Sequence, residues 1–267
     1  MDGAQLHYIE HGAGAPLIFI HGSLSDYRTW QDQMAPFGNS YHVVAYSRRY
    51  HYPNATTCPT GQSPVIQQRD DLAQMINILG LAPACLVGSS FGGIVASLVA
   101  LEHPELVRAL ILGGPPFLSL LSPTGQQDIE NRVLAPSRQA LDRGEVEKGI
   151  RTFLDGMITD GFYQGMQPAS RQRILDNAPS FSLEQMTPFN QRFPSLTSAD
   201  LSKLHSPTLL ITGQHDPPYL ALITERLLAA IPNIERVAIP GLSHGGLHNQ
   251  NTRAYNQAVL TYLRGRF

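Results

Sequence analysis

The sequence predicts an α/β fold in which helices flank a mostly parallel sheet. Short apolar runs of strand length alternate along the chain with segments of helical length. Several of these runs end in glycine-containing turns that also carry serine, histidine or aspartate, which is typical of the carboxyl edge of a parallel sheet. At 267 residues, the chain is long enough to bury a large core.

The alternation begins near the amino end and continues to about residue 115. Ser63 and Pro64 are favoured at the N-cap and first helical positions, so we expect a helix from there to Leu79. The apolar stretch 94–100 is long enough to form a second, packed helix. Strands are expected on both sides of these helices, at 6–10, 16–20, 42–45, 84–88 and 107–112.

The strand pattern then stops and resumes at Thr208. The intervening chain predicts helices joined by loops, at 126–134, 137–143, 146–157 and 169–177. Two further strands are expected after it, at 208–212 and 235–239. We therefore expect a core made of residues 1–115 and 205–267, with residues 116–204 as a helical insertion.

A tight turn joins the expected strand at 84–88 to the helix that follows it. Its residues, Gly88-Ser89-Ser90-Phe91-Gly92, fit the pattern Gly-x-Ser-x-Gly with Ser90 at the apex. Side chains at the two glycines would collide with the neighbouring strand and helix. Ser90 is therefore the candidate nucleophile. The alternative, a serine that only caps the helix, does not explain both glycines.

Two later strands end in residues that could activate Ser90. His244 follows the last expected strand and is the candidate general base, with His248 one helical turn later as the alternative. Asp216 follows the strand before it and is the candidate acid that orients the histidine. The alternative for Asp216 is an ordinary Asp-Pro turn. The turn at 113–116 contains no carboxylate, which favours Asp216.

The sequence resembles the α/β-hydrolases of the capped esterase, lactonase and C–C hydrolase type. The resemblance rests on the serine motif, on His21-Gly22 after an early strand, and on the order Ser90, Asp216, His244. It covers nearly the whole chain. It implies an eight-stranded, mostly parallel α/β-hydrolase sheet flanked by helices, with residues 116–204 as a helical cap inserted after the sixth strand.

The resemblance also implies an oxyanion hole formed by the backbone N–H groups of Ser23 and Phe91. His21 is expected to order this turn rather than to take part in the chemistry. A cap above Ser90 would exclude water and shape the acyl pocket.

One loop departs from the family pattern. Hydrolases of this type usually show Asp-x-Arg-Gly-x-Gly there, whereas this chain has Tyr46-Ser47-Arg48-Arg49-Tyr50-His51. Either arginine could bind a substrate carboxylate or enolate, and the alternative is a purely structural role. The candidate substrate-binding residues are Arg48, Arg49, Tyr50, Met157, Phe189 and Tyr219.

These observations predict a cofactor-independent and metal-independent serine hydrolase. The expected substrate is an ester or lactone of a small to medium, largely apolar acid. One alternative is a hydrolase of C–C bonds in a β-diketone or vinylogous keto acid, which would use the same residues. Another is a receptor-like protein that binds a ligand without turnover, since fold and triad do not identify a substrate.

Composition narrows the range of partners. A formal charge of −2, with 15% charged residues, gives no basic surface for nucleic acid. No apolar run reaches membrane-spanning length and the amino end shows no signal core, so we expect a cytoplasmic monomer or homodimer that binds a small-molecule substrate. Cys58 and Cys85 do not form a disulfide framework, and Cys85 is expected in the core.

Overall fold

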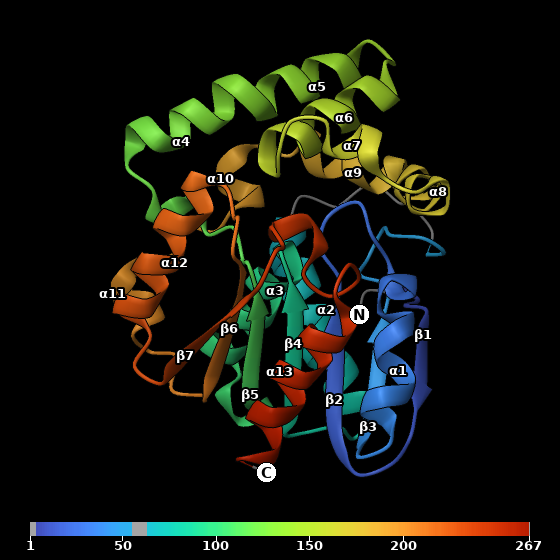
Figure 1. Cartoon of the computed structure of the whole chain (residues 1–267), viewed down its shortest axis with the longest axis vertical. Coiled ribbons are helices and arrows are strands. Elements are labelled where there is room, and N and C mark those ends of the chain that lie inside the picture. Colours follow the sequence, from blue (N-terminus) through green and yellow to red (C-terminus); the bar gives the residue numbers. More distant parts are fainter. Residues whose placement is uncertain (1–3, 55–62, 267) are drawn as a thin grey trace.

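The structure, a computed structural model, describes residues 4–54 and 63–266. These residues form one seven-stranded sheet in the order β1-β3-β2-β4-β5-β6-β7, in which β1 is antiparallel to β3 and all other neighbours are parallel (Figure 1). The strands are β1 (Tyr8–His11), β2 (Ala15–Ile20), β3 (Tyr41–Tyr46), β4 (Ala84–Ser89), β5 (Val107–Gly113), β6 (Thr208–Gly213) and β7 (Ile234–Ile239).

The predicted fold class is confirmed, with a correction to the strand count. Each strand expected from the sequence is present, but the described residues form seven strands and not eight. The helical insertion consequently follows the fifth strand, β5, rather than the sixth. The difference arises because the count of eight came from the family resemblance, whereas the apolar runs of the sequence indicated only these seven strands.

Alternation along the strands produces two separate apolar layers. In β2, Ile18 and Ile20 face one side of the sheet, whereas Leu17 and Phe19 face the other. The first layer is covered by α2 (Pro64–Ile78), α3 (Phe91–Glu102) and α12 (Pro218–Ala230). The second is covered by α1 (Gln31–Gly38) and α13 (Thr252–Arg264), so the sheet is buried on both faces as expected of parallel strands (Figure 1).

The chain between β5 and β6 is helical, and it lies above the carboxyl edge of the sheet (Figure 1). We refer to residues 118–201 as the helical segment. Its helices are η3 (Leu118–Leu120), α4 (Pro123–Ile129), the π-helical turn η4 (Glu130–Leu134), α5 (Ala135–Asp142), α6 (Val146–Met157), α7 (Phe162–Gly165), α8 (Pro168–Asp176), α9 (Ala178–Met186), α10 (Phe189–Arg192) and α11 (Ser198–Leu201).

The helix predicted at 146–157 begins and ends as expected, but two others differ. Residues 126–134 and 137–143 were expected as separate helices, whereas the structure joins them through the π turn into one continuous helical stretch. The two predicted helices left residues 135–136, which include Pro136, between them. In the structure the π turn precedes the proline, with the Ala135 N–H bonded to the Glu130 carbonyl, and Pro136 lies at the start of α5 within the continuous stretch.

Apolar side chains of the helical segment form their own cluster, which includes Ile150, Leu154, Ile174 and Phe181. One member comes from the sheet side: Leu24, in the loop that follows β2. We call residues 21–26 the β2 loop. Leu24 is 2% exposed, so this loop is held against the helical segment by apolar burial.

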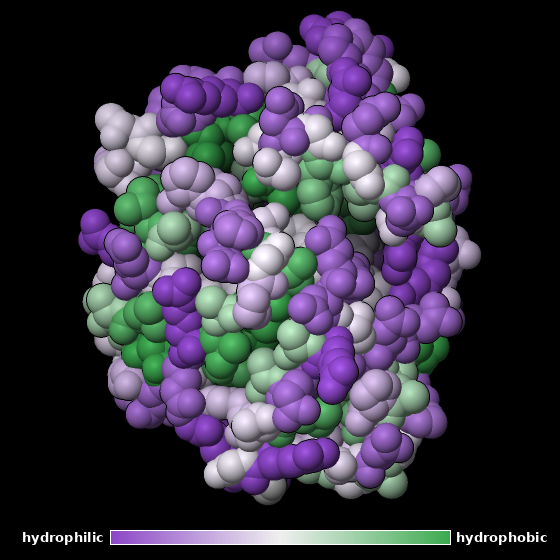
Figure 2. All heavy atoms as spheres, viewed as in Figure 1, coloured by the Kyte–Doolittle hydropathy of each residue, from purple (hydrophilic) through white to green (hydrophobic). Residues whose placement is uncertain are grey.

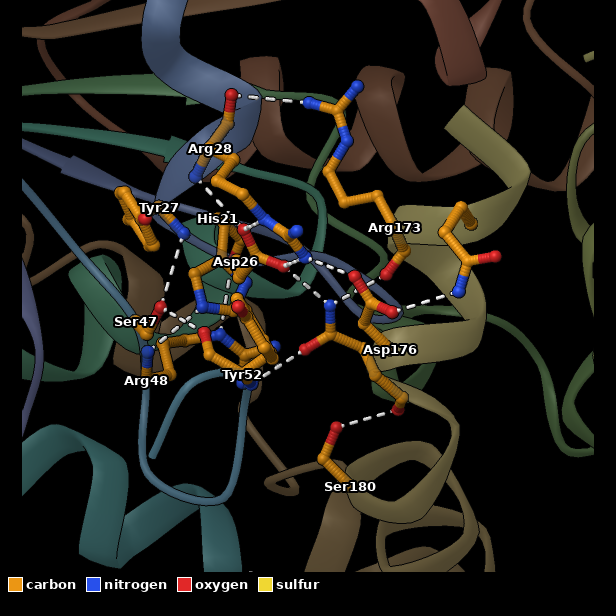
Figure 3. Close-up of polar contacts among 12 residues, drawn as sticks. His21, Asp26, Tyr27, Arg28, Ser47, Arg48, Tyr52, Arg173, Asp176 and Ser180 are labelled. Atoms are coloured by element: carbon orange, nitrogen blue, oxygen red, sulfur yellow. Dashed lines mark hydrogen bonds and ion pairs between the residues drawn. The ribbon is translucent and has the colours of Figure 1, made fainter. Parts of the chain in front are cut away.

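Polar contacts join the β2 loop to α8 and α9 (Figure 3). Asn177 donates from Nδ2 to Asp26 Oδ2 at 2.6 Å, and its Oδ1 accepts from the Tyr52 backbone N–H at 2.9 Å. Arg28 Nη2 lies 2.8 Å from both Asp26 Oδ2 and Asp176 Oδ2. Since Asp26 and Asn177 are both fully buried, these bonds satisfy polar groups that water cannot reach.

The sequence also led to expectations about the start of α2, the two cysteines and membrane-spanning segments. Ser63 is the N-cap residue of α2, but its hydroxyl donates to the Gln191 carbonyl and makes no cap bond. Cys85 is buried in β4, and burial raises the pKa of its thiol to about 12. Cys58 and the first three residues lie outside the described residues. Within the described part of the chain, no helix is both long enough and apolar enough to cross a bilayer.

Replacing Asn177 with alanine is expected to lower the free energy of unfolding by about 1–3 kcal/mol, because buried Asp26 loses a donor. Thermal unfolding measures this as roughly 2–4 °C of melting temperature per kcal/mol. Gln172→Ala is the matched control, since Gln172 is exposed and its single bond to Asp176 lies at the surface. Equal melting temperatures for the two variants would contradict this role of Asn177.

Candidate active site

Ser90 occupies a sharp turn between β4 and α3, with φ of 51° and ψ of −121°. Backbone packing explains the glycines on both sides of it. A Cβ at Gly88 would lie 2.5 Å from the Gly92 carbonyl oxygen, and a Cβ at Gly92 would lie 2.3 Å from the Ile20 carbonyl oxygen. The collisions predicted at these two positions are therefore confirmed. The turn leaves Ser90 half-buried at the carboxyl edge of the sheet.

His244 reaches Ser90 from the turn after β7. Its Nε2 lies 3.0 Å from Ser90 Oγ. The ring packs against Gly114, where a Cβ would lie 2.5 Å from His244 Nδ1. The alternative base, His248, is engaged elsewhere: its Nε2 lies 3.0 Å from Thr29 Oγ1, and its ring stacks on Trp30 with centroids 4.3 Å apart. The structure thus brings His244, and not His248, to the serine.

Asp216 lies close to His244 without bonding its ring. Asp216 Oδ2 accepts from the Gly213 N–H at 3.0 Å. Asp216 Oδ1 and His244 Nδ1, the two atoms that the expected bond would join, are both buried and have no hydrogen-bond partner. The expected hydrogen bond between carboxylate and imidazole is therefore not formed in this structure, although neither of the two atoms bonds any other group.

Burial controls the protonation of this pair. It lowers the pKa of His244 to about 4, so the imidazole is neutral at pH 7 and can accept a proton. Burial raises the pKa of Asp216, and the hydrogen bond from the Gly213 N–H opposes that rise. A neutral histidine in contact with a serine hydroxyl is the state that a general base requires.

The two expected oxyanion donors lie beside Ser90. Ser23 and Phe91 both line the cavity above the serine. Phe91 is the first residue of α3, so its N–H has no partner within the helix and is available to an anion. The β2 loop comes close enough that a Cβ at Gly22 would lie 3.0 Å from Ser90 Cβ. These positions suit backbone donors directed at one oxygen bound to Ser90.

The cavity above Ser90 encloses about 170 Å³ between the sheet edge and the helical segment. In Figure 2 the outer side of α4 and α5 is hydrophilic, whereas hydrophobic residues show in the recess beneath them. Most of the cavity wall is apolar, and its larger apolar residues are Phe153, Leu154, Met157, Ile158, Phe162, Met166, Ile174, Phe193 and Tyr219. An apolar wall around few polar groups is typical of a small-molecule site.

Two of the candidate substrate-binding residues line this cavity and a third does not. Met157 and Tyr219 are in its wall, and the Tyr219 hydroxyl donates to the Met157 carbonyl at 3.0 Å. Phe189 is outside the wall and packs on Phe193, with ring centroids 5.1 Å apart. Phe189 therefore packs against a wall residue and does not itself line this cavity.

None of the three candidate residues in the loop after β3 lines this cavity. Arg48 is fully buried and all its N–H groups face protein acceptors. Arg49 pairs through two nitrogens with Asp71, and the Tyr50 hydroxyl donates to Gln67 at 2.8 Å. The loop side chains are therefore committed to the fold.

The sequence predictions did not identify several polar residues that line the cavity, namely Ser25, Thr29, Ser170, Arg173 and Asn249, and did not place His248 there. Arg173 comes from α8, and its Nη1 donates to the Arg28 carbonyl at 3.2 Å (Figure 3). Within the described residues Arg173 forms no ion pair. The helix at 169–177 was expected, but no local signal indicates which of its arginines faces the cavity.

Comparisons with known proteins agree with this geometry. A family model described as "Alpha/beta hydrolase family" matches residues 17–258. The (E)-2-((N-methylformamido)methylene)succinate hydrolase of Acinetobacter baylyi is 25% identical over 228 residues, covering 82% of this chain and 79% of that protein. The 2-hydroxy-6-oxononadienedioate/2-hydroxy-6-oxononatrienedioate hydrolase of Comamonas testosteroni is 25% identical over 272 residues, covering 98% of this chain and 92% of that protein.

Solved structures show the same fold. One described as "Est816 as an N-Acyl homoserine lactone degrading enzyme" superposes with a TM-score of 0.77 at 21% sequence identity, covering 100% of this chain and 98% of that chain. At this identity the likeness concerns the fold alone.

His244 is expected to titrate in the folded protein near pH 4, well below the ordinary 6.5, because burial disfavours the imidazolium. Between these two values the unfolded chain binds the proton more tightly, so protein stability should fall as the pH drops from 6.5 towards 4. Histidine NMR measures the midpoint, with the resonance assigned by its loss in His244→Gln. A midpoint above about pH 6 would show that burial does not control the pKa of this ring.

Proposed function

The chain belongs to the alpha/beta hydrolase family, and we propose that it is a serine hydrolase that cleaves an ester or a lactone of a small to medium, largely apolar acid. The observation that carries this proposal is the contact of 3.0 Å between Ser90 Oγ and His244 Nε2, at the floor of an apolar cavity. A serine hydroxyl becomes a useful nucleophile only when a base removes its proton.

The reaction would proceed through an acyl-enzyme. Ser90 Oγ attacks the carbonyl carbon of the substrate while His244 Nε2 takes the hydroxyl proton. The carbonyl π electrons move onto oxygen, and this oxyanion accepts from the Phe91 and Ser23 N–H groups. His244 then returns the proton to the leaving oxygen as the bond to the acyl carbon breaks. Water, activated by the same imidazole, releases the acid and restores Ser90.

Asp216 is proposed as the acid that orients His244. When Nε2 accepts a proton, Nδ1 carries the other one and needs an acceptor. Asp216 Oδ1 is the buried, unpartnered oxygen beside it. A small movement of the ring or carboxylate that joins these two atoms would satisfy both and stabilise the imidazolium formed during the reaction.

We propose that the helical segment, residues 118–201, forms the body of a cap domain whose bounds are residues 116–204. It supplies most of the apolar wall, including Phe153, Met157 and Phe193. Such a wall would exclude water from the acyl-enzyme and select the acid by its length and shape.

The test of this function is the hydrolysis of p-nitrophenyl esters and of lactones by the purified chain, with Ser90→Ala as the variant. Loss of the nucleophile is expected to lower kcat by at least about 1,000-fold. A fluorophosphonate should add one group to the wild type, at Ser90, as measured by intact-protein mass and peptide mapping.

Ser89→Ala is the matched control, because it removes the adjacent hydroxyl and leaves the contact with His244 intact. It should retain both activity and labelling. A folded wild-type protein that is neither labelled nor active on any of these substrates would contradict the proposal and favour a ligand-binding role.

A second candidate function, hydrolysis of a C–C bond in a vinylogous keto acid, is favoured by Arg173. This cation lines the cavity and forms no ion pair within the described residues, so its remaining donors could bind a substrate carboxylate. The two relatives named above, hydrolases of a substituted succinate and of dienedioates, support an acid-bearing substrate. Ser90 and His244 would act on such a substrate from the same positions.

If Arg173 binds a carboxylate, Arg173→Met should lower kcat/KM about 10- to 100-fold on a p-nitrophenyl ester that carries a free carboxylate. The neutral ester of equal length should change less than about threefold, since its contacts are apolar. Arg171→Met is the control, because Arg171 lies on the same helix outside the cavity wall. Equal losses on both esters would assign Arg173 a structural role only.

A further inference from the structure

Arg48 is a buried cation directly behind the β2 loop. Its side chain is 0% exposed, and it follows β3, the neighbour of β2 in the sheet. A guanidinium in such a place is tolerated only when its N–H groups are bonded. The way in which these five groups are distributed shows what the residue does.

Two of the five N–H groups bond the backbone of the β2 loop. Arg48 Nε donates to the His21 carbonyl oxygen at 3.0 Å, and Nη2 donates to the Gly22 carbonyl oxygen at 3.0 Å. His21 and Arg48 are drawn in Figure 3. The second Nη2 hydrogen faces His51 Nε2 at 3.1 Å. Nη1 faces the side-chain oxygens of Gln68 in α2 and of Glu184 in α9. The guanidinium plane is thus fixed on all sides.

The bond to Gly22 controls the direction of the next N–H group. The Gly22 carbonyl oxygen and the Ser23 N–H belong to one planar, trans peptide unit, in which they point in opposite directions. Holding the oxygen against Arg48 therefore turns the Ser23 N–H away from Arg48. Ser23 lines the same cavity as Ser90, whereas Arg48 is fully buried, so an N–H turned away from the guanidinium can face that cavity.

A second donor holds the same carbonyl and is itself held by Arg48. The Arg48 backbone N–H donates to His21 Nε2 at 2.9 Å, so the His21 proton is on Nδ1, which donates to the Gly22 carbonyl at 2.8 Å. Burial lowers the pKa of His21 well below its ordinary value, which keeps this tautomer neutral. Arg48 also lies 5.0 Å from the ring centre of Phe91, the residue of the other oxyanion donor.

We propose that Arg48 is a positioning residue of the oxyanion hole, which fixes the peptide between Gly22 and Ser23 so that the Ser23 N–H faces the oxygen bound to Ser90. This inference rests on the proposed function and deepens it. Arg48 touches no substrate, and it acts through the backbone it holds. Lysine cannot replace it, since one ammonium cannot reproduce two parallel bonds to neighbouring carbonyls.

The test is Arg48→Lys, with p-nitrophenyl butyrate as substrate. We expect kcat to fall about 10- to 100-fold while KM stays within about threefold, because the misplaced donor acts on the transition state and not on the bound ester. A trifluoromethyl ketone of similar size, which adds to Ser90 and forms an oxyanion, should lose affinity by a similar factor. The matched trifluoromethyl alcohol, which forms no oxyanion, should bind equally to both proteins.

Arg49→Lys is the matched control. Arg49 is the next residue and is paired with Asp71, yet it has no contact with the β2 loop. It should keep kcat and ketone affinity within about threefold of the wild type, whatever its effect on melting temperature. If Arg48→Lys does not fold, Gln68→Met replaces it. Loss of one of the two Nη1 acceptors should loosen the guanidinium and lower kcat severalfold with KM unchanged.

The outcomes distinguish a failure of the proposed hydrolase function from a failure of the positioning role of Arg48. A wild type that neither cleaves the ester nor binds the ketone overturns the proposed function and the role of Arg48 with it. An active wild type whose Arg48→Lys variant keeps kcat and ketone affinity, or loses no more than Arg49→Lys, overturns the positioning role alone. If Gln68→Met is used instead, an unchanged kcat likewise overturns the positioning role of Arg48.

Discussion

Ser90 holds a backbone conformation, with φ of 51° and ψ of −121°, that a residue with a Cβ adopts only when its surroundings enforce it. Here the surroundings are two places where backbone segments come into close contact because a glycine leaves no side chain between them. Gly88 admits the first turn of α3, and Gly92 admits the end of β2. The second close contact brings the β2 loop to the serine, so the tight turn at Ser90 also determines where the proposed oxyanion donors and the cavity wall can lie.

The β2 loop is then fixed from three directions. Arg48 donates to two of its carbonyl groups, and Leu24 is buried against the helical segment. Asp26 accepts a hydrogen bond from Asn177, the N-cap residue of α9. Buried charges and amides are expensive to desolvate, and each is offset here by bonds to a different part of the chain. The helical segment therefore shapes the cavity wall and also stabilises the loop that carries Ser23, a proposed oxyanion donor.

Local sequence patterns were sufficient for the strands, for α6 and for the positions of Ser90, His244 and Asp216. Each of these follows from an apolar period or from a polar residue at the end of a strand, which are properties of a few adjacent residues. The roles proposed for Arg48 and Arg173 could not be predicted from such local patterns. Both arginines stand in polar stretches, and only tertiary packing buries the first and turns the second towards the cavity.

The contact between the side chains of Asp216 and His244 could not be predicted from the sequence either. Strand ends place the two residues together, but the bond between them depends on shifts of a side chain that no sequence pattern encodes. The strand count differed for another reason, since eight came from the family and not from the apolar runs of this chain.

A crystal structure of the protein after reaction with a phosphonate ester is the most direct test of the proposed catalytic site. Ser90 Oγ should be bonded to phosphorus, with one phosphoryl oxygen about 2.7–3.1 Å from the backbone nitrogens of both Phe91 and Ser23. The alkyl group should lie against the apolar wall that contains Met157 and Phe193. An adduct on another residue, or a phosphoryl oxygen that faces solvent and bonds neither nitrogen, would contradict the proposed site.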